Sequence, residues 1–285
     1  MDVGLLGLAF SLLPWKEGRK AAIWRQICSD QQPSFSQDER RELDGLSKKM
    51  GTLREEAAGL GARLVLPNET DSSHLQEGLP YPVALWVRGN LPPPARCLAV
   101  VGSRTSSAAG LKSAFCLCRD LANFNVGIIS GLARGIDTAA HLGALDAAGA
   151  VGGTTWGVLG SGLSRPYPIE NVPLMERIVR SGGGVLTCFP PEANPNKWHF
   201  PKRNLLMAAW TKGVVVVEAR AKSGSLITAK LALDLGREVW VMPGQAGDPH
   251  SEGGNELLRE GAANFARGAS DILEDIESLW YSERN

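Results

Sequence analysis

The chain has 285 residues, 44% of them hydrophobic, and its 30 basic side chains balance its 30 acidic ones. This composition is typical of a soluble globular protein with a full core, and no apolar run approaches the roughly 20 residues that cross a bilayer. We therefore expect a cytoplasmic protein with no membrane contact. The 5 cysteines are odd in number and scattered, so neither a disulfide framework nor a zinc site fits, and we expect no metal and no cofactor.

The first 90 residues read as a small, mainly helical domain. A proline run, Pro92 to Pro94, separates it from the rest of the chain, because such a run is a stiff connector that ends any helix. We place the domain boundary near Asn90, with domains at 1–90 and 91–285. The expected helices are 5–13, 20–29 and 38–60, and the expected extended pieces are 63–66 and 84–87.

From Arg96 onward, short β-branched runs alternate with segments of helical length. The expected strands are 97–101, 126–130, 155–159, 185–188, 214–218 and 238–242. The expected helices are 108–122, 136–148, 171–180, 203–211, 226–235 and 256–260. This alternation predicts the α/β class, with a mostly parallel sheet covered by helices on both faces. Continuous apolar strands such as Val214–Val217 suit a sheet that is buried on both sides.

Small residues come directly after several of these strands, and a basic residue accompanies them in most cases. The segments concerned are Gly102-Ser103-Arg104, Ser130-Gly131 with Arg134, Gly160-Ser161-Gly162, and Ser223-Gly224-Ser225. Glycine lets a backbone approach a ligand closely, and the free N–H groups of a helix's first turn attract anions. Because the carboxyl ends of parallel strands meet at one edge of a sheet, we expect these loops to converge on one ligand site.

The run from Lys197 to Ala229 is locally basic in a neutral chain. It places cations such as Lys197 and Arg203 beside the rings of Trp198 and Phe200. Zero net charge argues mildly against long-range steering towards nucleic acid, but it does not oppose a local basic site. Cations along a backbone track, with aromatic faces for the bases, are the groups that single-strand binding without sequence preference requires.

The loops together strongly resemble the DNA-processing protein A (DprA/Smf) family. The segments that carry the resemblance are VVGSRTSSAAG, SGLARGIDTAAHLGAL, GVLGSGLSRPYPIEN, HFPKRN, VVVVEARAKSGSLITAKLALDLGREVWVMPG and GGNELLREGA. The resemblance implies an extended Rossmann-like domain that binds single-stranded DNA. It also implies that the protein protects incoming DNA, helps to load the recombinase RecA during natural transformation or recombination, and forms a homodimer through this domain.

The resemblance also assigns site residues. In the family pattern Gly102, Ser103 and Arg104 hold the DNA backbone, Lys197 contacts a phosphate and Phe200 lies against a base. The remaining expected DNA-binding residues are the Arg203 and Asn204 pair, together with Ser130, Gly131, Arg134, Ser223, Gly224 and Ser225.

Simpler explanations stay open for several of these side chains. Trp198 is equally suited to the core, and His199 to a structural hydrogen bond. Arg134 is suited to an ion pair with Asp137, and Glu218 to orienting a neighbouring arginine.

Two departures from the family bear on the ends of the chain. Many members have a glycine-rich, helix-hairpin-helix-like turn near the N-terminus, where this chain has Trp15 to Gly18. We therefore expect a degenerate SAM or helix-hairpin-helix-like domain without backbone contacts to DNA. Many members also carry a winged-helix-like C-terminal domain, and we expect none here because the chain ends soon after Leu279.

The rival class is an enzyme, above all a Rossmann-like nucleotide-binding enzyme of the phosphoribohydrolase type. A member of this class would resemble the phosphoribohydrolases in carrying the pattern PGG-x-GT-x-x-E, in which the acid acts on the glycosidic bond. The local analogue here, KSGSLITA, has neither the PGG nor the glutamate. A serine hydrolase would need a G-x-S-x-G elbow, and a dinucleotide oxidoreductase would need an acid after the second strand. Neither is present, so we expect a binding protein and not an enzyme.

Overall fold

The computed structural model describes residues 2–93, 96–147 and 154–282. Pro94 of the proline run and Ala148 at the end of an expected helix lie outside the described residues. The strands are β1 (Arg63–Val65), β2 (Leu85–Gly89), β3 (Cys97–Val101), β4 (Gly127–Ser130), β5 (Thr155–Val158), β6 (Gly184–Thr187), β7 (Gly213–Val216), β8 (Glu238–Val241) and β9 (Asn264–Phe265). Within the described ranges they form one sheet in the order β1-β2-β6-β5-β4-β3-β7-β8-β9.

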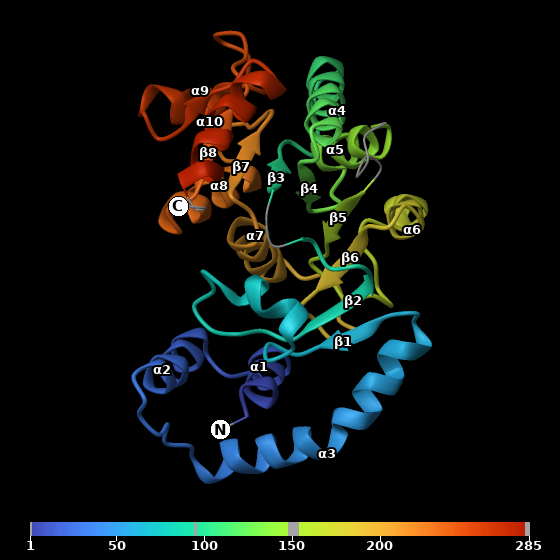
Figure 1. Cartoon of the computed structure of the whole chain (residues 1–285), viewed down its shortest axis with the longest axis vertical. Helices are drawn as coiled ribbons and strands as arrows, with labels where there is room; N and C mark the ends of the chain where they lie inside the picture. Colours follow the sequence, from blue (N-terminus) through green and yellow to red (C-terminus); the bar gives the residue numbers. More distant parts are fainter. Residues whose placement is uncertain (1, 94–95, 148–153, 283–285) are drawn as a thin grey trace.

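Helices flank this sheet and fill the N-terminal part of the chain (Figure 1). They are α1 (Val3–Leu12), α2 (Glu17–Cys28), α3 (Gln37–Gly59), α4 (Ala108–Asn123), α5 (Ile136–Leu145), α6 (Val172–Arg180), α7 (His199–Ala209), α8 (Gly224–Asp234), α9 (Glu252–Arg259) and α10 (Ala269–Ser282), with short 3₁₀ turns η1 (Thr70–Gln76) and η2 (Ile169–Asn171). Across the described ranges, none of the helices combines the length and apolarity that a membrane span requires.

The central strands are buried on both faces, and β3 shows why. Its alternate residues point to opposite sides, so that Leu98 and Val100 pack with α4, α5 and α10, while Ala99 and Val101 pack with α7 and α8. Across the sheet, the seven neighbouring strands β6, β5, β4, β3, β7, β8 and β9 all run parallel. The predicted α/β class, with its mostly parallel sheet and its helical N-terminal part, is confirmed.

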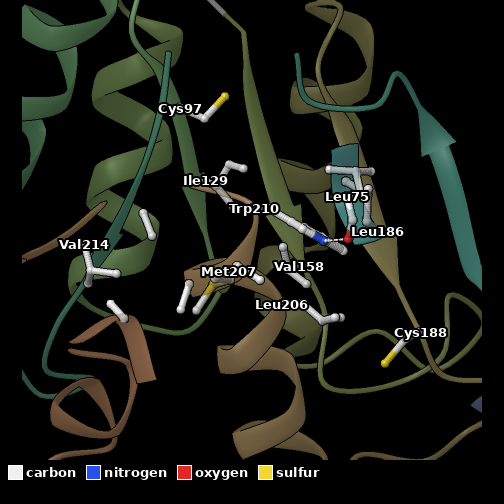
Figure 2. Packing of buried hydrophobic residues seen from close by; sticks show 14 of the residues in the cluster. Leu75, Cys97, Ile129, Val158, Leu186, Cys188, Leu206, Met207, Trp210 and Val214 are labelled. Atoms are coloured by element: carbon white, nitrogen blue, oxygen red, sulfur yellow. Dashed lines mark hydrogen bonds between the residues drawn. The ribbon is translucent and has the colours of Figure 1, made fainter. Parts of the chain in front are cut away.

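The N-terminal part joins the same sheet. β1 pairs with β2, and β2 pairs with β6, both antiparallel. The buried indole of Trp210, just after α7, donates a hydrogen bond of 2.7 Å to the carbonyl of Leu75 in η1 (Figure 2). Leu6 and Phe10 of α1 belong to the same apolar cluster as Leu206 of α7. The division of the chain at residue 90 stays a prediction.

The Trp210 hydrogen bond generates a stability prediction. Trp210→Phe removes the donor from a buried carbonyl, so the free energy of unfolding should fall by about 1–3 kcal/mol. Urea denaturation followed by circular dichroism measures this change. The matched control is Trp198→Phe, at an indole that is 72% exposed, which should change stability by less than about 0.5 kcal/mol. Equal stability of the two variants would show that the hydrogen bond contributes nothing.

Candidate functional site

The candidate functional site lies where the chain order of the strands reverses. β3 and β7 are parallel neighbours, but β4 to β6 lie on one side of them and β8 and β9 on the other. In open α/β sheets the crevice outside the carboxyl ends of such strands binds ligands. A cavity of about 450 Å³ lies here, between the loop after β3, the loop after β7 and the first turn of α7.

Most of the expected residues line this cavity. They are Gly102, Ser103, Arg104, Lys197, Phe200, Arg203, Asn204, Ser223, Gly224 and Ser225. Gly131 and Arg134 line an adjoining pocket that shares Arg104, Phe200 and Arg203 with the cavity. Ser130 lies behind both: it is fully buried, and its hydroxyl donates a hydrogen bond of 2.6 Å to the carbonyl of Val100. Its side chain reaches neither space.

The accessible charge around the cavity is positive. Arg104, Lys197, Arg220 and Lys222 line it and are exposed. Among the described residues that line it, Asp137 is the single acid, and its side chain is buried. A negatively charged ligand in the cavity would therefore meet exposed cations, and no exposed carboxylate of the lining would repel it.

Sequence reasoning missed two of these cations. Arg220 and Lys222 are not among the residues that the sequence assigns to the site, yet both line the cavity. Arg220 also lies 3.4 Å from the imidazole Nε2 of His250. The available signal was the spacing in Arg220-Ala221-Lys222-Ser223, which places two cations directly before the glycine-rich start of α8.

Arg203 is a buried cation that ties the edge of the sheet together. Only 4% of it is exposed, and its Nη1 donates to the carbonyl of Gly131 and, at 3.0 Å, to that of Val158. Its Nε donates to the side-chain oxygen of Asn204 at 3.0 Å. A Cβ on Gly131 would overlap the guanidinium, so glycine is needed at that position. The Nη1 and Nε donors of Arg203, which the sequence predicts to bind DNA, are thus taken by the carbonyls of Gly131 and Val158 and by the side chain of Asn204.

Asp137, at the start of α5, compensates this buried charge. Its carboxylate accepts hydrogen bonds from the backbone N–H of Gly131 at 3.1 Å and of Ala133 at 3.3 Å. Burial raises the pKa of Asp137, while the positive charge of Arg203 opposes that rise. Burial lowers the pKa of Arg203 to about 10, against the opposing effect of Asp137. Arg203 and Asp137 are therefore two buried opposite charges that influence each other, and the charge of the exposed Arg104 acts on both.

The ring of Phe200 is held against the open side of the cavity. The guanidinium carbon of Arg104 lies 4.9 Å from its ring centroid. A Cβ on Gly160 would come within 2.8 Å of the ring, so the absence of a side chain there makes room for it. Arg104 and Phe200 thus place a cation and an aromatic face side by side, as the sequence predicts.

The two residues before Phe200 differ in their surroundings. His199 stacks on Phe189, with ring centroids 3.9 Å apart, and its Nδ1 lies 3.2 Å from the carbonyl of Gly160. It is the structural histidine of the alternative explanation. Trp198 is 72% exposed, so the suggestion that it belongs to the core is wrong.

Two further alternatives are corrected by the contacts. Arg134 pairs with Glu170 in η2, and not with Asp137. Glu218 orients the start of α4: its carboxylate accepts from the Ser107 N–H at 3.0 Å and from the Ser107 hydroxyl at 2.5 Å. The carboxylate contacts this serine and, at 3.8 Å, the imidazole Nδ1 of His250, and not the arginine that the sequence suggests.

The start of α8 faces the cavity with polar groups. Ser223 caps this helix, and its hydroxyl oxygen accepts a hydrogen bond from the N–H of Ser225 at 3.3 Å. The two hydroxyl oxygens lie 2.6 Å apart. Ser223, Gly224 and Ser225 all line the cavity, so the positive end of the helix dipole adds to the field of the cations.

Fold and site together define a Rossmann-like α/β protein whose switch-point cavity fits an anionic ligand with aromatic parts. The family model of DNA recombination-mediator protein A matches residues 65–277. The chain belongs to this family, and the resemblance found in the sequence is confirmed.

Relatives with known sequences or structures agree. Protein Smf of Escherichia coli is 42% identical over 69% of this chain and 52% of its own length, so the chain spans about half of that relative. The crystal structure of DNA processing protein A of Streptococcus pneumoniae superimposes with a TM-score of 0.63 at 40% identity, covering 70% of this chain and 69% of that one.

A third relative has been studied for its ligand. DNA processing protein A of Helicobacter pylori superimposes with a TM-score of 0.65 at 25% identity, over 76% of this chain and 96% of that one. Its structure is described as giving insight into a single-stranded DNA binding mode of that protein.

The Arg203–Asp137 pair generates a pH-dependent prediction. Arg203→Met leaves the Asp137 carboxylate buried without its cation and leaves two carbonyls without a donor, so stability at pH 7.5 should fall by about 3–5 kcal/mol. The pKa of Asp137 then rises further in the folded state. When the pKa of a carboxyl is higher in the folded protein than its unfolded value of about 3.9, the free energy of unfolding falls as pH rises through the folded pKa.

The destabilisation by Arg203→Met should accordingly be smaller at pH 4.5 than at pH 7.5. Urea denaturation at both pH values measures it. Arg220→Met is the matched control, because this exposed arginine is not among the charges that shift the pKa of Asp137 and should change stability by less than about 0.5 kcal/mol at either pH. A loss in Arg203→Met that is the same at both pH values would contradict the role given to Asp137.

Proposed function

We propose that the chain binds single-stranded DNA in the cavity at the switch point. The observation that carries the proposal is the combination of four exposed cations with an accessible ring around one cavity. A nucleic acid strand offers the complementary groups, namely phosphates for the cations and base faces for the ring.

The strand must be single for a geometrical reason. In a duplex the base faces are stacked on one another, so an aromatic side chain can take a base only if that base is unstacked. The Phe200 ring is held in place by Gly160 and Arg104, not by a partner ring stacked on it. Within the site, Arg104, Lys197 and Lys222 bind phosphates, and the ring of Phe200 stacks on a base. Arg203 holds α7 against the edge of the sheet.

The alternative is a nucleotide-binding enzyme of the phosphoribohydrolase type. Hydrolysis of a glycosidic bond needs a carboxylate that reaches the substrate. The acid that lines the cavity, Asp137, is buried and occupied by the N–H groups of Gly131 and Ala133. This supports a binding role, and we propose that the chain is not an enzyme.

Three further proposals rest on family membership. The protein protects incoming DNA, helps to load RecA recombinase during natural transformation or recombination, and forms a homodimer through its Rossmann-like domain. A fourth proposal is that residues 1–90 form a degenerate SAM or helix-hairpin-helix-like domain, whose strands β1 and β2 extend the sheet of the DNA-binding domain at residues 91–285.

Salt dependence of binding tests the site. With about four to six phosphates contacted, the logarithm of affinity for oligo-dT should fall with the logarithm of salt concentration at a slope near −3 to −4, about 0.7 per phosphate. Arg104→Ala and Lys197→Ala should each make the slope shallower by about 0.7, because each removes one contact. Phe200→Ala should weaken binding with little change in slope. Fluorescence anisotropy with labelled oligo-dT measures all of these.

The control cation is Lys230, which is exposed on α8 and outside the residues lining the cavity. Lys230→Ala should leave both affinity and slope unchanged. Unaltered oligo-dT binding in the Arg104, Lys197 and Phe200 variants would remove the cavity as the DNA site. A large rise in melting temperature with a mononucleotide, and none with oligo-dT, would favour the enzyme instead.

A further inference from the structure

Three aromatic rings near the cavity each carry a cation. The guanidinium of Arg134 lies 5.8 Å from the centroid of Tyr167, that of Arg104 lies 4.9 Å from Phe200, and the ammonium of Lys197 lies 5.0 Å from Trp198. The proposed function uses only the central ring. The two outer rings have no role in it, although each repeats the same pairing of a π-face with a positive charge.

The three pairs line spaces that adjoin one another. The cavity shares Arg104 and Phe200 with a small pocket that Tyr167 and Arg134 also line. It shares Pro201 and Ile227 with a mostly apolar groove of about 450 Å³, which Trp198 lines and which has no lining residue in common with the small pocket. A ligand that extends from the cavity into either space therefore meets a further ring.

The outer rings are exposed, which is costly for large apolar groups unless a ligand covers them. Trp198 is 72% exposed and Tyr167 is 36% exposed. The rings of Tyr167 and Phe200 are tilted by 57° with centroids 6.2 Å apart, so they do not stack face to face. This spacing exceeds the roughly 3.4 Å rise per base of a stacked strand, so bases on the two rings would be separated from each other.

We propose that Tyr167 and Trp198 are outer base positions, so that one DNA strand crosses three ring–cation pairs in the order Tyr167, Phe200, Trp198. The inference rests on the proposed function and extends it to residues outside the cavity. The occupant is the same strand, because continuity with the cavity and repeated cation–ring pairs both fit a chain of alternating phosphates and bases.

The two ends of this proposed row differ in charge. Arg134 is also paired with Glu170, which reduces its attraction for a phosphate. Lys197 makes no ion pair within the described part of the chain. The Trp198 end therefore offers both a base face and an available cation, and it contributes more to affinity than the Tyr167 end.

The experiment compares two ligands and paired variants. Oligo-dT and an abasic strand of equal length have the same phosphates, but only oligo-dT has bases to stack. Trp198→Leu removes the aromatic face and keeps an apolar side chain, whereas Trp198→Phe keeps a ring. Tyr167→Leu and Tyr167→Phe do the same at the other end. Phe124→Leu, at a ring that is 62% exposed beyond the end of α4, is the control.

We expect Trp198→Leu to weaken oligo-dT binding by roughly 5- to 150-fold, the loss of one stacked base, with an unchanged salt slope. Tyr167→Leu should have a smaller effect in the same direction. The two phenylalanine variants should retain most of the affinity, and no variant should alter binding of the abasic strand. Trp198→Phe should also lose part of the quenching of tryptophan emission that oligo-dT produces in the unaltered protein.

The outcomes separate this inference from the proposed function. Oligo-dT binding that is weakened by Phe200→Ala but not by the Trp198 and Tyr167 variants overturns the three-ring row and leaves the cavity site standing. Equal weakening for the abasic strand also overturns it, because stacking would not be the cause. An unaltered protein that does not bind oligo-dT at all overturns both.

Discussion

The buried guanidinium of Arg203 is the interaction on which the site depends. From α7 it donates to the carbonyl of Gly131 after β4 and to that of Val158 at the end of β5, and it faces the charge of Asp137 on α5. Removing an arginine from water is costly, and these hydrogen bonds and the buried carboxylate offset that cost. The first turn of α7, which carries Phe200, is thereby fixed to the carboxyl edge of the sheet.

A neutral interior pair leaves the exposed cations to define the field of the cavity. Asp137 is buried near Arg203, so the acid that lines the cavity exposes no carboxylate beside Lys197 or Lys222, although its charge also acts on Arg104. The position of the buried guanidinium also explains why residue 131 is a glycine. Any Cβ there would displace the guanidinium and would break the link between α7 and the sheet. Glycine near this cavity thus serves packing as much as approach of a ligand.

The sequence predicted the central sheet well because its strands are continuous apolar runs with glycine or polar residues at their ends. The bounds of β3 match the expected 97–101, and the loops converge as parallel strands require. α7 begins at His199 and not at Arg203, because Pro201 sits in the first turn, where its missing N–H costs nothing.

Contacts between distant segments could not be predicted in the same way. The burial of Arg203, the exposure of Trp198 and the hydrogen bonds from Ser107, the N-cap of α4, to Glu218 each depend on which segments meet in space. Nothing local to these residues records it. The zero net charge of the chain says equally little about the site. Charges further apart than the Debye length, about 8 Å at physiological salt, are largely screened from one another, so only charges close to the cavity act on a ligand there. In the proposed DNA site, attraction for a polyanion would therefore come from the few cations at the cavity, and as salt rises the aromatic faces beside them would carry a growing share of the affinity.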